Sequence, residues 1–224
     1  MVQRVHFTKK LEELRLLLLR MASLAEVAVH NAVKAFLANE SDLAESVIMG
    51  DNEINQLEDT IDKLTLELLA QDQPVARDLR FIIGAMRVTV NLERLGDEAV
   101  NLGHRALFLS TRPPLPFNQK MERLCDVAKK MLADALKAFV ENDIRLAEEV
   151  IASDSQADEL NMKLLRDYVN DMVSESRVVE RAVHCIMAAR HLERVGDLST
   201  NIAEAVIFIV EGESVKHMKY KYRG

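Results

Sequence analysis

The chain has 224 residues, of which 49 % are hydrophobic, 29 % are charged and only 4 % are aromatic. Its formal net charge of -7 argues against a general nucleic-acid-binding protein. With 7 glycines, 4 prolines and no tryptophan, the core must be built from Leu, Ile, Val, Ala and Met, a composition typical of an all-helical protein. Hairpin turns of the Asn-Gly or Asp-Gly type and sustained polar–apolar alternation are missing from the sequence, so we expect an all-α fold.

Apolar residues recur three and four positions apart along most of the chain, which is typical of packed amphipathic helices. The pattern is interrupted by capping and turn residues after 38, by Pro74, by the proline-rich stretch Arg112–Pro116, and again near Asn142 and Ser174. These interruptions predict six helices, over 8–38, 42–71, 75–110, 118–140, 144–173 and 177–211.

The sequence also contains an internal repeat. Residues 34–58 align without gaps onto 137–161, and 11 of the 25 positions are identical. We therefore expect a tandem pair of antiparallel three-helix bundles related by a pseudo-twofold internal repeat, with one bundle over 1–112 and the other over 113–224. The second bundle ends in a basic tail from about 214.

Two acidic segments repeat each other at a spacing of 100 residues. Glu93-Arg-Leu-Gly-Asp97 and Glu193-Arg-Val-Gly-Asp197 each place two carboxylates four positions apart, which is one turn on the same helix face. An asparagine follows each segment after a further four residues.

If the second and third helices of each half form a hairpin, Asp51 faces the gap between the first pair of carboxylates, and Asp154 faces the gap between the second pair. Clustered carboxylates repel one another, and a hard cation with oxygen ligands removes that cost. The hairpin register therefore predicts two sites for divalent or trivalent metal ions. The predicted metal ligands are Asp51, Asn55, Glu93, Asp97 and Asn101 in the first half and Asp154, Asp158, Glu193, Asp197 and Asn201 in the second.

Two alternatives to a metal site follow from the same residues. Solvated ion pairs with Arg94 and Arg194 would satisfy the carboxylates at under about 1 kcal/mol each. A carboxylate-bridged helix-bundle metalloenzyme would need Glu-x-x-His pairs, which this sequence lacks, so metal storage is the stronger alternative function. Gly96 and Gly196 lie inside a predicted helix, and we expect the backbone to approach a neighbouring helix closely there.

The remaining candidates are weaker. The pairs Glu26/His30 and Glu180/His184 have one-turn spacing but no counterpart in the other half, so we interpret them as surface or core pairs. Cys125 and Cys185 fit no metal or redox spacing and are expected to be buried thiols. A signal peptide is not apparent, and we expect no stretch to supply the roughly 20 apolar residues of a membrane span, which indicates a cytoplasmic protein.

The duplicated acidic segments resemble the paired signatures of the PhoU family of bacterial phosphate-signalling regulators. The resemblance covers the whole chain, and Asp51 and Asp154 match the family's acidic positions on the preceding helix. It implies multinuclear iron or zinc clusters at the acidic sites, as in some members. It also implies a non-enzymatic negative regulator of the phosphate regulon that works with the ATPase of the phosphate ABC transporter and a sensor histidine kinase. We further expect a homodimer.

One position departs from the repeat. Asn55 stands where the second half has Asp158, so the first site has one fewer negative charge. We therefore expect the two sites to be unequal.

Overall fold

The computed structural model describes residues 2–71, 74–116 and 118–213. Within them the chain forms six α-helices and no strand, as predicted. The helices are α1 (Val2–Ala38), α2 (Ser41–Gln71), α3 (Ala76–Ser110), α4 (Gln119–Glu141), α5 (Ile144–Ser174) and α6 (Val179–Glu211), with the short 3-10 helix η1 (Ser176–Val178) before α6. The predicted boundaries agree to within two residues, except that α1 begins at Val2 instead of residue 8. The basic tail predicted from about 214 lies outside the described residues.

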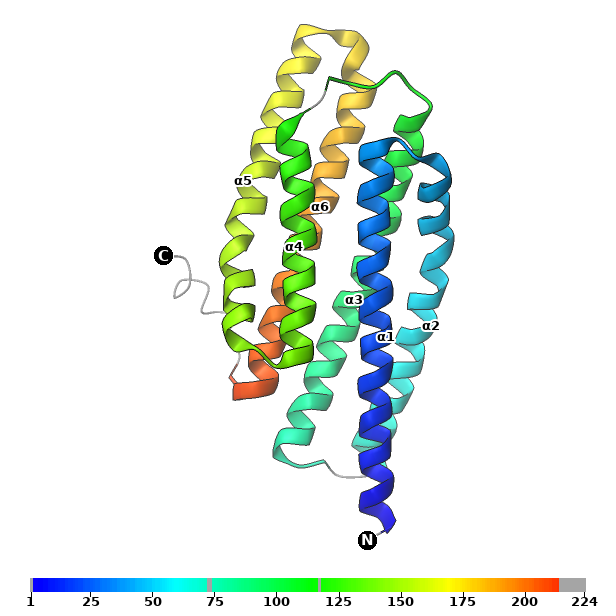
Figure 1. Cartoon of the computed structure of the whole chain (residues 1–224), viewed down its shortest axis with the longest axis vertical. Coiled ribbons are helices and arrows are strands. Elements are labelled where there is room, and N and C mark those ends of the chain that lie inside the picture. Colours follow the sequence, from blue (N-terminus) through cyan, green and yellow to red (C-terminus); the bar gives the residue numbers. More distant parts are fainter. Residues whose placement is uncertain (1, 72–73, 117, 214–224) are drawn as a thin grey trace.

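The helices form two three-helix bundles that lie side by side (Figure 1). Helices α1, α2 and α3 pack together in the first half, and α4, α5 and α6 pack together in the second. Helices α3 and α6 run antiparallel against each other and join the halves, while α1 also contacts α4. The buried apolar side chains of the two halves join into one continuous hydrophobic core.

The repeat is visible in the backbone. Asn39 and Asn142 end the first helix of each half in the left-handed conformation, with φ of 55° and 54°. Asparagine tolerates this conformation better than most residues. Asp143 then caps α5, because its side chain accepts a hydrogen bond of 3.1 Å from the backbone nitrogen of Leu146. The two helix turns are therefore built from matching residues 103 positions apart.

Helix α1 differs from the sequence prediction in its hydropathy. Over His6–Ala38 it is long and apolar enough, by length and composition, to cross a membrane, and its most apolar stretch of 18 residues has a mean hydropathy of 1.4. The sequence was expected to contain no such stretch. Leu14, Leu18, Met21 and Ala25 on this helix are completely buried in the core. These side chains pack inside the bundle, although only 39 % of the most apolar 18-residue stretch is buried, and a core helix meets the same criteria as a membrane span.

Candidate metal centres

The α2–α3 hairpin brings Asp51 to the level of the first acidic segment, as the predicted register requires. A Cβ atom added to Gly96 would lie 2.7 Å from Asp51 Oδ1 and 3.1 Å from Ile54 Cδ1. Real Cβ atoms essentially never come as close as the first of these distances, so a side chain at position 96 would force Asp51 to shift, and the glycine leaves room for its carboxylate against α3. Asp51 therefore faces α3 between Glu93 and Asp97.

Four carboxylates form the first cluster. Burial raises the pKa of Glu93, and the charges of Asp97, Glu58 and Asp51 raise it further, against a smaller lowering by Arg94. Burial and Asp51 likewise raise the pKa of Asp97. The pKa of Glu58 is raised by burial and by its acidic neighbours, including Asp97. In each case the direction means that the ionised form is disfavoured by desolvation and like charge.

The two carboxylate oxygens of Asp51 differ in their hydrogen bonding. Its Oδ2 accepts a hydrogen bond of 2.9 Å from Asn55 Nδ2. Its Oδ1 is buried and has no hydrogen-bond partner among the described residues. A buried carboxylate oxygen without a partner costs free energy unless a cation or a donor occupies the space beside it.

The second cluster is more tightly assembled. Asp158, Glu193 and Asp197 each offer a carboxylate oxygen, and these atoms lie within 4.8 Å of one another. No other group of three potential ligands converges in this way within the residues that the structure describes. Burial raises the pKa of Glu193, as do Asp197 and Asp158, while Arg190 and Arg194 lower it.

Asp154 has a different environment from its counterpart Asp51. Its side chain is only 7 % exposed, and Thr200 Oγ1 donates a hydrogen bond of 3.4 Å to its Oδ1. It is not one of the three converging ligands. The two clusters are thus built from the same repeat positions but differ in which carboxylates come together.

The two asparagines that follow the acidic segments lie on α3 and α6. Asn101 is half-buried. Asn201 donates from Nδ2 to the Oδ1 atom of Asn91 across the α3–α6 contact, at 3.2 Å. The amide of Asn201 therefore links the two halves, a contact that the hairpin register did not predict.

A polar group between the halves lies beside both clusters. His191 Nδ1 is 2.7 Å from Glu98 Oε2. Arg194 lies 3.8 Å from Glu98 and 3.6 Å from Asp197, and Glu98 also contributes to the raised pKa of Asp97. Sequence reasoning missed Glu98 and His191 because the repeat has Leu198 and Asn91 at the matching positions.

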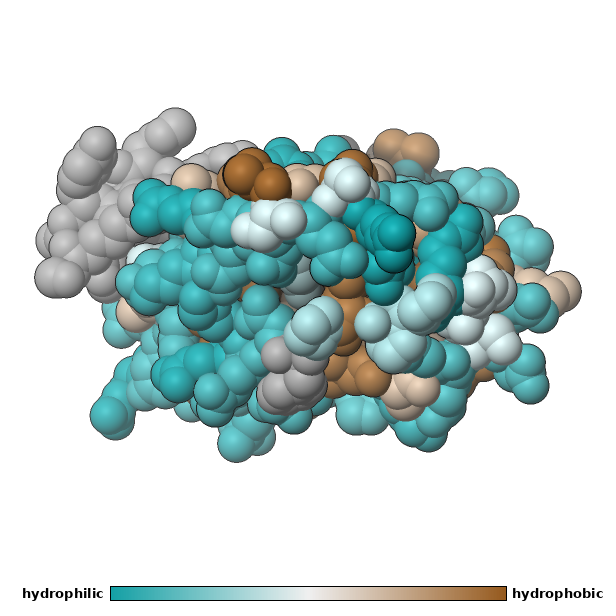
Figure 2. Space-filling view, turned by 90° about the horizontal axis from the view of Figure 1, so that it is seen from above, coloured by the Kyte–Doolittle hydropathy of each residue, from teal (hydrophilic) through white to brown (hydrophobic). Residues whose placement is uncertain are grey.

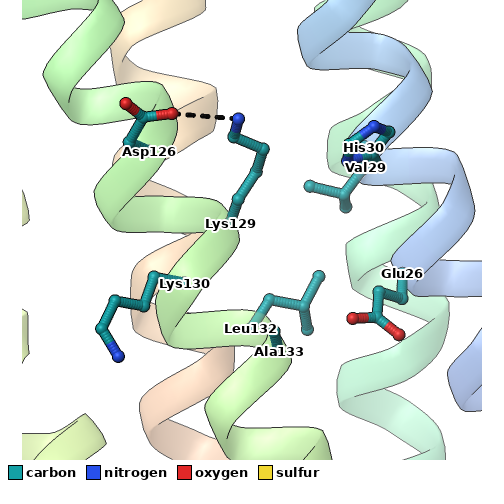
Figure 3. Close-up of a pocket in the computed structure, with 8 residues that line it drawn as sticks. All are labelled: Glu26, Val29, His30, Asp126, Lys129, Lys130, Leu132 and Ala133. Carbon is teal, nitrogen blue, oxygen red and sulfur yellow. Dashed lines mark ion pairs between the residues drawn. The ribbon is translucent and has the colours of Figure 1, made fainter.

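A cleft of about 340 Å³ lies elsewhere, between α1 and α4 (Figure 3). Glu26 and His30, one of the spaced pairs in the sequence, line its α1 side. On the α4 side Lys129 pairs with Asp126 at 3.0 Å. The cleft is therefore lined by charged side chains of both signs, and none of its residues belongs to either acidic cluster. In the other spaced pair, Glu180 forms an ion pair with Arg112 and His184 stacks on Phe108.

The two cysteines are buried and free, as the sequence predicts. Burial raises the pKa of Cys125 to about 12, so its thiol stays protonated.

The donor set fits a hard metal ion. The clusters supply carboxylate oxygens from neighbouring helices, half-buried except at the exposed Asp97, and such oxygens suit Mg²⁺, Ca²⁺, Mn²⁺ and iron. In the first half the partnerless Asp51 Oδ1 is the atom that a cation would satisfy, and in the second half the Asp158, Glu193 and Asp197 oxygens converge.

Known proteins resemble this chain over almost its whole length. A family model described as the PhoU domain matches it twice, over residues 18–106 and 121–206. The phosphate-specific transport system accessory protein PhoU homolog of Aquifex aeolicus is 38 % identical over 216 residues, which cover 96 % of this chain and 98 % of the relative. The homolog from Pseudomonas putida is 39 % identical over 216 residues, covering 96 % of this chain and 84 % of that protein.

Solved structures agree with the sequence comparison. The crystal structure of PhoU from Pseudomonas aeruginosa superposes with a TM-score of 0.90 at 38 % identity, covering 92 % of this chain and 100 % of that one. The phosphate transport system regulatory protein PhoU from Streptococcus pneumoniae gives a TM-score of 0.85 at 27 % identity, covering 93 % and 99 %. With two matched domains, six helices and duplicated acidic segments, this chain belongs to the PhoU family.

Proposed function

We propose that this chain is a non-enzymatic, cytoplasmic negative regulator of phosphate uptake and of phosphate-regulon signalling. In this role it couples the ATPase of the phosphate ABC transporter to a sensor histidine kinase through protein contacts. Support comes from its relatives, which are named as accessory or regulatory proteins of phosphate transport. The sequence offers no Gly-rich phosphate loop, nucleophile motif or kinase signature that would favour catalysis.

We further propose that the two acidic clusters bind metal ions as part of this role. The observation that carries this proposal is the buried Asp51 Oδ1, which lacks a partner while Glu93 and Asp97 stand beside it with raised pKa values. A divalent or trivalent ion, such as iron or zinc, would neutralise the repulsion and supply the missing partner. Bound metal would then stabilise the surface formed by α2, α3, α5 and α6.

The experiment that tests the regulatory role is direct binding. The chain, purified without chelators or a nickel column, is mixed with the purified transporter ATPase and with the cytoplasmic part of the sensor kinase. We expect complexes with both proteins. If neither protein binds and phosphate signalling is unchanged when the gene is deleted, the regulatory role is wrong.

Measuring the metal content of the same preparation tests whether the two acidic clusters bind metal ions. We expect bound metal in the wild-type protein and its loss in a Glu93→Ala/Glu193→Ala double variant. Unchanged metal content in the variant would show that Glu93 and Glu193 are not metal ligands. Bound metal without any effect on phosphate signalling would instead favour metal storage.

A further inference from the structure

The contact between α3 and α6 contains an ion pair that is well covered by protein. Most ion pairs among the described residues are exposed on at least one side, and hydrophilic side chains cover most of the end of the molecule that Figure 2 shows. His191 on α6 and Glu98 on α3 differ, because their side chains are only 20 % and 16 % exposed and Nδ1 lies 2.7 Å from Oε2. Glu98 is therefore a carboxylate held in place at the boundary between the two halves.

Arg194 stands between this carboxylate and the second acidic cluster. Its Nε atom lies 3.8 Å from Glu98 Oε1, and its Nη1 atom lies 3.6 Å from Asp197 Oδ2. Both distances are too long for a hydrogen bond, so the guanidinium is attracted by two carboxylates and bonded to neither. The Arg194 side chain is 50 % exposed, which leaves it space to move toward either of them.

Asp197 cannot serve Arg194 and a metal ion equally well. Its carboxylate is one of the three ligands that converge in the second cluster, and a cation bound there repels a guanidinium at such short range. Glu98 is the other acceptor within reach of Arg194. Its Oε1 atom faces Arg194 while its Oε2 atom faces His191, so it can accept from both side chains at once.

The first half has no equivalent of this second acceptor. Arg94 occupies the matching position beside the first cluster, where its charge lowers the pKa of Glu93. The residue that matches Glu98 in the repeat is Leu198, which is buried and apolar. The repeated fold therefore does not require a carboxylate at position 98, and the arrangement around Arg194 belongs to the second cluster alone.

We propose that Arg194 is a displaceable counterion of the second cluster and that Glu98 receives it when a metal ion binds. In the metal-free protein Arg194 offsets part of the repulsion at Asp197. After displacement the same side chain pairs with Glu98 and adds a bond between α3 and α6. Occupation of the second cluster is thereby transmitted to the contact between the two halves. This inference rests on the proposed metal binding.

The test is a double-mutant cycle on the affinity of the second cluster for Mn²⁺. All proteins carry Glu93→Ala, which impairs the first cluster, and free Mn²⁺ is followed by electron paramagnetic resonance. The cycle compares this parent with Glu98→Gln, with Arg194→Gln and with both changes together. Urea unfolding in buffer with a chelator confirms that each variant folds.

We expect Glu98→Gln to weaken Mn²⁺ binding by about threefold or more, because Arg194 then has no carboxylate to move to and competes with the ion. Arg194→Gln should tighten binding, since the competing cation is gone. Once Arg194 is removed, Glu98→Gln should change the affinity by less than about twofold, because the Glu98 charge then acts only over a screened distance.

Arg190→Gln is the matched control. It removes another arginine whose charge acts on Glu193 in the second cluster. Glu98→Gln should keep its full effect on Mn²⁺ affinity in this background, which separates the loss of Arg194 from the loss of any positive charge. The Nε–H proton of Arg194 should also exchange more slowly with water when Zn²⁺ is added, and this slowing should be lost in Glu98→Gln.

The possible outcomes separate this inference from the proposed function. An equal effect of Glu98→Gln with and without Arg194, or no effect in either case, overturns the inference and leaves metal binding in place. Unchanged or weaker Mn²⁺ binding by Arg194→Gln alone also overturns it, even if Glu98→Gln does not fold. If the wild-type chain binds metal but the Glu93→Ala parent does not, the second cluster is not a site and the inference falls. If the wild type binds no metal, the proposed metal binding falls with it.

Discussion

Replacing Asp51 with asparagine should stabilise the metal-free protein, which is the opposite of what most substitutions at half-buried positions do. Asparagine has the same shape and can keep a contact with Asn55. Its amide nitrogen, placed where Oδ1 lies, would present a donor to a cluster that otherwise consists of acceptors. The substitution thus removes one negative charge from a cluster of carboxylates that repel one another. It also replaces Asp51 Oδ1, an acceptor without a partner, by a donor.

The size of the effect follows from these two contributions. An unsatisfied buried polar group costs about 1–3 kcal/mol, and exposed charge pairs contribute under about 1 kcal/mol. We therefore expect a gain of about 1–2 kcal/mol in the free energy of unfolding, or a rise of roughly 2–8 °C in Tm for a chain of this size. Urea unfolding of the wild type and the variant, in buffer with a chelator, measures this difference in the free energy of unfolding.

The matched control is Asp154→Asn. Asp154 already accepts a hydrogen bond from Thr200, so the substitution has no missing partner to supply. We expect no gain there, and a loss of up to about 1 kcal/mol.

Added Mn²⁺ completes the experiment. At tenfold over its dissociation constant, each occupied site adds about 1.4 kcal/mol to the stability of the wild-type protein. Asp51→Asn should lose about half of the total gain, because the cluster around Asp158 still binds. Destabilisation of the metal-free Asp51→Asn variant, or a Mn²⁺ response equal to that of the wild type, would show that Asp51 is neither unsatisfied in the metal-free protein nor a metal ligand.

Three further predictions follow from local features. Gly50→Ala should raise the free energy of unfolding by about 0.5–1 kcal/mol, since nothing lies within 4 Å of the new methyl group. Gly96→Ala should lower the free energy of unfolding by about 1–2 kcal/mol, because its Cβ would overlap Asp51 and Ile54. Urea unfolding of both variants measures these opposite effects. The metal-free protein should become more stable as pH falls from about 7 to about 5. In the folded state the pKa of Glu93 lies above the 4.5 of an ordinary glutamate, so the folded chain binds this proton at a higher pH than the unfolded chain does. That gain should be under about 1 kcal/mol per carboxylate and absent with saturating Mn²⁺, and stability that falls over this range would contradict it. Asp143→Ala should cost about 1 kcal/mol in urea unfolding through loss of the α5 cap, and an unchanged midpoint would argue against the cap.

The fold was predictable from the sequence because its signals are local and duplicated. The turn residues near Asn39 and Asn142 and the break at Pro74 place the helix ends. The repeat then fixes the hairpin register, and Gly96 marks the close approach. Glu58 could also have been found, since it lies seven residues after Asp51 and so on the same face of α2.

The contacts between the halves were not predictable in the same way. The bonds from Asn201 to Asn91 and from His191 to Glu98 depend on how α3 packs against α6. The hairpin register holds no information on that packing, and at Glu98 the repeat changes a charged residue into a leucine. For the same reason the different environments of Asp51 and Asp154 appeared only in the structure.

The most direct test of the account is the expression of a phosphate-starvation reporter in cells that lack this chain and grow in high phosphate. We expect high expression in the deletion strain and renewed repression when the wild-type chain is restored. A reporter that stays repressed without the chain would contradict its role as a negative regulator.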